Sequence, residues 1–97
     1  MKRQAVVINI KDNVATVVDD VAEGTDVKFL IGETEFSVKL VESIPIGHKF
    51  AITEIPPGSD IIKYGESIGR ASTRIMSGQY VHVHNMESQR GRGDWNN

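Results

Sequence analysis

Two histidines separated by one residue are the most distinctive chemical feature of the sequence. His82 and His84 stand in the stretch Tyr80-Val-His-Val-His-Asn-Met86. Alternate side chains of a β-strand point to the same face, so a strand here would place both imidazoles beside Tyr80 on an exposed face, with Val81 and Val83 in the core. Paired imidazoles can bind a metal ion or an anion, or transfer protons near neutral pH. A solvated or hydrogen-bonded pair is the alternative.

Four further residues could take part in the same chemistry. His48 follows Gly47 in a predicted turn, and three histidines could form a metal site. Lys49 and Lys63 could each pair with a carboxylate, although Lys63 could instead protect an edge strand from aggregation. Tyr64 could donate a hydrogen bond, or could be a half-buried core residue with its hydroxyl in water. No nucleophile–base pair and no phosphate-binding loop is recognisable.

Composition excludes several classes of protein. The 97 residues suffice for one domain, and the absence of cysteine excludes disulfides and zinc–thiolate sites. The net charge of −2 argues against a nucleic-acid partner. The apolar run at the N-terminus is too short for a signal peptide, and no stretch is long enough to span a membrane. We therefore expect a cytoplasmic protein with no membrane partner; a homo-oligomer stays open.

The chain is rich in β-branched residues and glycine, which predicts an all-β domain with many short strands. We expect the domain to cover residues 1–87, followed by a polar flexible tail over 88–97. Alternating patterns predict the strands Ala5 to Ile10, Val14 to Val18, Val27 to Ile31 and Glu35 to Leu40. Tight turns are expected at 11–13 and 32–33. A single helical turn is expected around residues 71–76.

A short motif occurs four times along the chain. An apolar residue, two further residues, glycine, two further residues and another apolar residue follow one another at Val21 to Val27, Ile44 to Phe50, Ile55 to Ile61 and Ile75 to Val81. Glycine accepts a positive φ, so each motif predicts a tight turn. The flanking apolar residues would anchor both sides of each turn in a core.

Three blocks of residues 44–85 stand out, namely Ile44-Pro45-x-Gly47-His48-Lys49-x-Ala51, Ile62-Lys63-Tyr64-Gly65-x-x-Ile68-Gly69-x-Ala71 and Val81-His82-x-His84-Asn85. In this order and spacing they resemble the SAF domain at the amino terminus of the altronate and galactarate dehydratase family. They cover somewhat under half of the chain. The resemblance implies a β-clip fold, in agreement with the all-β pattern.

The resemblance also implies a function. The chain would be the small subunit, or the N-terminal domain, of a metal-dependent lyase that dehydrates sugar acids such as altronate or galactarate. A large catalytic partner would complete the enzyme and hold most of a divalent metal site, with iron or manganese. The small subunit of sulfolactate sulfo-lyase is similar in these blocks and offers a second function. A stand-alone carbohydrate-binding SAF module is a third.

The same resemblance assigns roles to individual residues. It implies that His48, His82 and His84 face the active site as catalytic groups, and that His82 and His84 are candidate metal ligands. Lys49, Lys63, Tyr64 and Asn85 become candidate substrate-binding residues. The alternatives are that Asn85 shapes a turn and that the histidines only contact the partner.

Overall fold

The computed structural model describes residues 4–87, and these residues form nine strands and no helix. The strands are β1 (Ala5–Val6), β2 (Val14–Val17), β3 (Asp26–Ile31), β4 (Thr34–Lys39), β5 (Lys49–Ala51), β6 (Asp60–Lys63), β7 (Glu66–Ala71), β8 (Tyr80–Val81) and β9 (Met86–Glu87). The all-β prediction is confirmed. Over the same residues, no helix is long and apolar enough to cross a membrane.

The four repeated motifs all fold as the same tight turn. Their central glycines have φ between 83° and 87°, a region that L side chains avoid. The apolar residues on both sides of every turn are buried, with at most 5% of their surface exposed; they are Val21, Val27, Ile44, Phe50, Ile55, Ile61, Ile75 and Val81. The predicted anchoring of each turn in a core is therefore confirmed.

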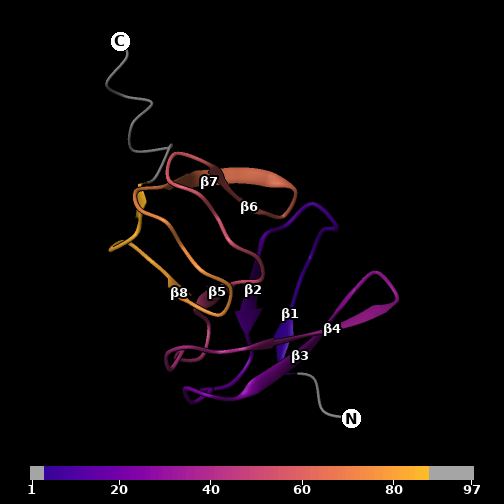
Figure 1. The fold of residues 1–97 in the computed structure, drawn as a ribbon. Helices are drawn as coiled ribbons and strands as arrows, with labels where there is room; N and C mark the ends of the chain where they lie inside the picture. Colours follow the sequence, from indigo (N-terminus) through magenta and orange to yellow (C-terminus); the bar gives the residue numbers. More distant parts are fainter. Residues whose placement is uncertain (1–3, 88–97) are drawn as a thin grey trace.

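Backbone bridges join the turns in pairs and divide the domain into two similar halves. Val21 pairs with Ile44 and Ile55 pairs with Ile75, both antiparallel. Between the turns of each pair runs one hairpin, β3–β4 in the first half and β6–β7 in the second. The two hairpins lie toward opposite ends of the molecule, with β2, β5 and β8 between them (Figure 1). Each half has its own cluster of buried apolar side chains.

The central sheet positions the candidate site. Its strand order is β1-β2-β5-β8, with β5 antiparallel to both neighbours. Lys49 lies opposite Val81 and Phe50 opposite Tyr80. Strand β5 leaves the turn around Gly47, and strand β8 leaves the turn around Gly78. The pairing therefore brings together two turns that are far apart in the sequence.

Three sequence predictions need correction or lie outside the described residues. The strand expected from Ala5 to Ile10 ends at Val6, and the side chains of Ile8 and Ile10 are 59% and 79% exposed. The helical turn expected around residues 71–76 is wrong, because Ile75 forms a β-bridge with Ile55 instead. The tail predicted over residues 88–97 falls outside the described range.

Candidate active site at the β5–β8 pairing

The two histidines lie in a turn and not on a strand. Strand β8 ends at Val81, and the N–H of Asn85 donates to the carbonyl of His82 at 3.1 Å, which closes a turn over residues 82–85. Val81 is fully buried as expected, but Val83 is 76% exposed. The prediction that both valines face the core on a continuous strand is therefore wrong.

The buried side chain of Asn85 explains the turn. Its Oδ1 accepts the N–H of His82 at 3.0 Å, and its Nδ2 donates to the carbonyl of Tyr80 at 2.8 Å. Its own carbonyl accepts the N–H of Ser72 at 3.0 Å. Both ends of the amide thus satisfy backbone groups that the end of β8 leaves unpaired. This geometry corresponds to the turn-shaping alternative, and substrate contact by Asn85 stays a prediction.

Tyr80 stands at the centre of the three histidine rings. Its hydroxyl lies 2.7 Å from His48 Nδ1 in a hydrogen bond. Its ring stacks on that of His82, with centroids 5.5 Å apart and planes at 19°. The ring of His84 approaches edge-on at 5.6 Å, and the rings of His48 and His82 are 5.0 Å apart. All three predicted histidines are therefore brought together.

Tyr80 was predicted to lie beside His82 and His84 but was not itself predicted to be a site residue. Tyr80 and His82 are two residues apart at the end of β8, so their side chains lie on the same side of the backbone. The spacing of two residues therefore predicts that the rings of Tyr80 and His82 are in contact. The contact with His48 could not be found in this way, because it depends on the pairing of β5 with β8.

Basic groups lie around the cluster formed by Tyr80 and the three histidines. Burial, and then the charge of Lys63, lowers the pKa of Lys49 below its usual value. The pKa of His82 is also lowered, first by desolvation and then by the charges of His48, Lys49 and His84. A neutral imidazole can accept a proton, and clustered cations attract a carboxylate. The arrangement thus suits binding of an anion next to a proton acceptor.

The lowered pKa of His82 predicts that folding stability falls as the pH drops below about 6.5. The unfolded chain binds this proton first, so the contribution of His82 is fully present above its unfolded pKa and is lost as the pH falls toward its folded pKa. Thermal unfolding of the chain across this pH range measures the effect. His82→Gln is expected to remove it, whereas His84→Gln should retain most of it, because the His84 charge is the smallest of the four causes. Identical pH profiles for His82→Gln and the unmodified chain would contradict the prediction.

Lys63 is the last residue of β6, and Tyr64 follows it in the two-residue turn between β6 and β7. Tyr64 has φ 59°, its side chain is 58% exposed, and Lys63 Nζ lies 5.0 Å from the centroid of its ring. Lys63 lies near enough to Lys49 to affect its pKa. Strand β6 is also an edge strand of its sheet, so the protective role of Lys63 stays open. Substrate contact by Lys63 and Tyr64 stays a prediction.

A buried carboxylate fixes this turn from the other side. Asp12 Oδ1 accepts the N–H of Gly65 at 2.8 Å, and its Oδ2 accepts the N–H of Asn9 at 3.1 Å. Asp12 is only 6% exposed, so these backbone donors have little access to water. The loop after β1 thus holds the Tyr64–Gly65 turn in place.

Removal of this carboxylate is expected to destabilise the domain. Asp12→Ala leaves two backbone N–H groups without their acceptor, for which we expect a loss of about 2–3 kcal/mol in the free energy of unfolding. Urea denaturation measures it. Asp12→Asn, which retains one acceptor oxygen, should lose less. If Asp12→Ala unfolds at the same urea concentration as the unmodified chain, the carboxylate does not hold the turn.

The described residues do not by themselves fit a metal centre. Over residues 4–87, no group of three or more His, Asp or Glu side chains is arranged to hold a metal ion. His48 Nδ1 is already engaged by the hydroxyl of Tyr80. Catalytic metal sites in proteins commonly use three protein ligands. Metal binding by His82 and His84 stays a prediction that requires donors from elsewhere.

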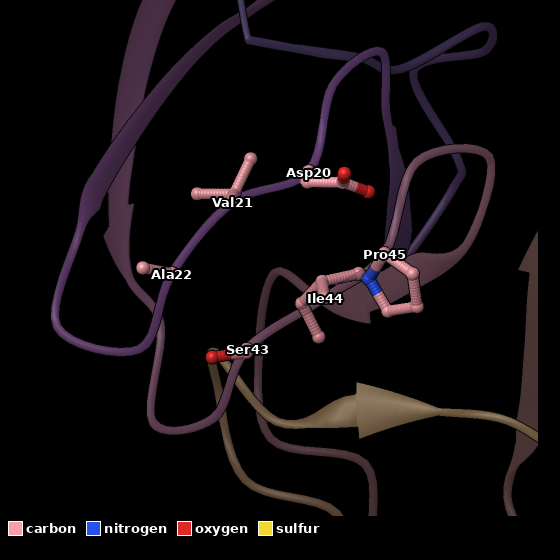
Figure 2. A pocket seen from close by; sticks show the side chains of 6 residues that line it. All are labelled: Asp20, Val21, Ala22, Ser43, Ile44 and Pro45. Carbon is pink, nitrogen blue, oxygen red and sulfur yellow. The ribbon is translucent and has the colours of Figure 1, made fainter.

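An open hollow of about 450 Å³ lies apart from the predicted site residues. Figure 2 shows its lining, which comes from the first pair of turns and consists of Asp20, Val21, Ala22, Ser43, Ile44 and Pro45. This lining is mostly apolar and its one ionisable group is an acid. The hollow therefore lacks the groups that would bind an anionic substrate, whereas basic groups gather around the cluster of Tyr80 with His48, His82 and His84.

Comparisons with known proteins point to one family. A model of the altronate/galactarate dehydratase SAF domain matches residues 3–89. The chain is 43% identical to altronate dehydratase of Escherichia coli K12 over 82 residues. It is 45% identical to the alpha subunit of (2R)-sulfolactate sulfo-lyase of Chromohalobacter salexigens over 56 residues, and 40% identical to galactarate dehydratase of Escherichia coli K12 over 70 residues.

The matches cover most of this chain but only part of each relative. The matches cover 84%, 58% and 72% of this chain, but only 16%, 57% and 12% of the respective relatives. The chain thus corresponds to one module of two much longer dehydratases and to part of a sulfo-lyase subunit. The match to the SAF domain covers all the described residues, including the four turns and the cluster of Tyr80 with the three histidines. The chain belongs to the family of altronate/galactarate dehydratase SAF domains.

Proposed function

We propose that this chain is the SAF module of a lyase that dehydrates a sugar acid such as altronate or galactarate. In this proposal a large catalytic partner completes the enzyme, and the module is inactive alone. The observation that carries the proposal is the cluster of Tyr80 with His48, His82 and His84, flanked by Lys49. The relatives named as dehydratases support the reaction class.

The residues of the cluster suit the groups that such a reaction requires. Dehydration of a hydroxy acid removes a proton from the carbon beside the carboxylate and expels the β-hydroxyl, which calls for a base and an acid. His82, whose pKa is lowered, is the candidate proton acceptor. Lys49 and Lys63 are the candidate partners of the substrate carboxylate. Tyr64 and Asn85 complete the proposed substrate-binding set.

The divalent metal belongs, in this proposal, mainly to the large partner. Iron or manganese is expected from the resemblance, but His82 and His84 are too few donors to hold it alone. The cluster would then lie against the partner's active site.

Purification of the tagged chain from its native host tests the proposal. The co-purifying material is assayed on altronate, galactarate and sulfolactate, with iron or manganese added. We expect a large partner and metal-dependent elimination of water from one of the two sugar acids. A preparation with neither a partner nor activity would exclude the lyase role and favour a carbohydrate-binding module.

One observation favours a second function, the small subunit of a sulfolactate sulfo-lyase. The alpha subunit of the Chromohalobacter salexigens enzyme is 45% identical to this chain, and the match covers 57% of that subunit. The cationic groups around His82 would suit a substrate with both a sulfonate and a carboxylate. Release of sulfite, and not water, in the same assay would establish this alternative.

A further inference from the structure

The hydrogen bond between Tyr80 and His48 is coupled to the tautomer of His48. A neutral imidazole has one N–H donor and one acceptor nitrogen. The Tyr80 hydroxyl lies 2.7 Å from His48 Nδ1, and the tautomer sets which of the two groups donates. A phenol hydroxyl is more acidic than a neutral imidazole N–H, which favours donation by Tyr80 and a ring proton on Nε2.

Both partners of this hydrogen bond are held by the backbone around them. The N–H of Tyr80 donates to Glu42 Oε2 at 3.0 Å, and its carbonyl accepts Asn85 Nδ2 at 2.8 Å. The N–H of His48 donates to the carbonyl of Pro45 at 3.0 Å, and the His48 carbonyl accepts the N–H of Val17 at 2.9 Å. The phenol therefore meets the imidazole in a defined geometry.

Ring contacts around Tyr80 also restrict the orientations that its side chain can adopt. The ring of His82 stacks on one face of Tyr80, and the Tyr80 ring also packs against the first buried apolar cluster. Rotation of the phenol away from His48 would disrupt these contacts. The half-buried imidazole of His48 is left with its second nitrogen for an incoming group.

We propose that Tyr80 is a positioning residue that holds His48 in the tautomer with the proton on Nε2, so that His48 donates a hydrogen bond to an oxygen of the substrate. This inference rests on the proposed function for the identity of the substrate, a hydroxy acid. A donor at this position suits the hydroxyl that leaves in the reaction, because that oxygen gains negative charge as its bond to carbon breaks. Tyr80 acts through His48 and needs no substrate contact of its own.

Nitrogen NMR of the chain with labelled histidine tests the tautomer directly. In the unmodified chain at a pH where imidazoles are neutral, we expect His48 to show an acceptor-type Nδ1 and a protonated Nε2. Tyr80→Phe keeps the ring but removes the hydroxyl, and should convert His48 to a mixture of tautomers. Tyr64→Phe makes the same chemical change in an exposed turn and should leave the His48 signals unchanged. A proton on Nδ1 in the unmodified chain, or no change in Tyr80→Phe, would overturn the inference.

The role of this tautomer in turnover is measured in the complete enzyme. Tyr80→Phe is expected to lower kcat on the order of 10–100-fold, as for other groups that orient a functional histidine, with a smaller change in KM. Full turnover by a variant whose tautomer is lost would refute the donor role. If the tautomer is as expected but the enzyme eliminates nothing from any of the three acids, the proposed function fails while the assignment of His48 stands.

Discussion

Replacement of His82 by Gln in the complete enzyme is expected to lower kcat by about 10²–10⁴-fold, the usual contribution of a general acid or base. The lowered pKa of His82 favours its uncharged form near neutral pH, and its ring packs against those of Tyr80 and His48. Gln retains polarity and approximate size but cannot transfer a proton. Steady-state kinetics on the substrate identified by co-purification measure the effect.

The structure explains why this variant should still fold. Asn85 binds the backbone N–H of His82 and not its ring, so the turn over residues 82–85 does not need the imidazole. Val83→Ala is a matched control in the same turn, because Val83 is exposed and carries no group that could transfer a proton. Near-normal turnover and metal content after replacement of both His82 and His84 by Gln would show that the pair has no role beyond the partner interface.

Gly78→Ala is expected to have the largest effect on stability. A Cβ at this position would lie 2.1 Å from the carbonyl oxygen of Lys39, and the backbone has φ 87°. The positive φ costs about 1–2 kcal/mol for an L residue, and the overlap adds roughly 1–3 kcal/mol. For a domain of this size the two terms correspond to a fall in Tm of roughly 10 °C or more.

Gly47→Ala separates the cost of the positive φ from the cost of the steric overlap. Gly47 has nearly the same backbone, with φ 84°, but no atom lies within 4 Å of the position of its Cβ. Gly47→Ala should therefore lower the free energy of unfolding only by the cost of the positive φ, about 1–2 kcal/mol. Thermal and urea unfolding of the two variants measure the difference. Equal losses would mean that the end of β4 at Lys39 shifts without cost and that the close approach at Gly78 contributes nothing.

Local sequence was sufficient to predict most of the turns and several strands. The four glycine motifs were recognisable because a tight turn needs a residue that tolerates positive φ, and because its apolar neighbours need burial. Strands β2, β3 and β4 agree with the predicted ones within one or two residues, since alternation and the Gly32-Glu33 turn define them locally. These features depend on few long-range contacts.

The errors have a common physical cause. Ala5 to Ile10 has the composition of a strand, but the loop after Val6 turns toward Gly65, where Asp12 accepts a backbone hydrogen bond. Residues 71–76 could form a helical turn, but Ile75 pairs with Ile55. Residues 81–84 alternate like a strand, but the buried Asn85 amide closes a turn. In each case a partner distant in sequence, or a side chain bonded to the backbone, overrides local preference.

Residue types and short spacings were enough to predict the all-β class, the repeated turns and the neighbouring pair His82 and His84. The long-range strand pairing was needed to show that His48 joins them and that Tyr80 lies at their centre. The hydroxyl of Tyr80 reaches His48 because strand β5 pairs with β8, and this pairing is set by burial of Phe50 and Val81 in the two cores. Contacts between residues separated by more than thirty positions depend on strand order, which no local pattern specifies.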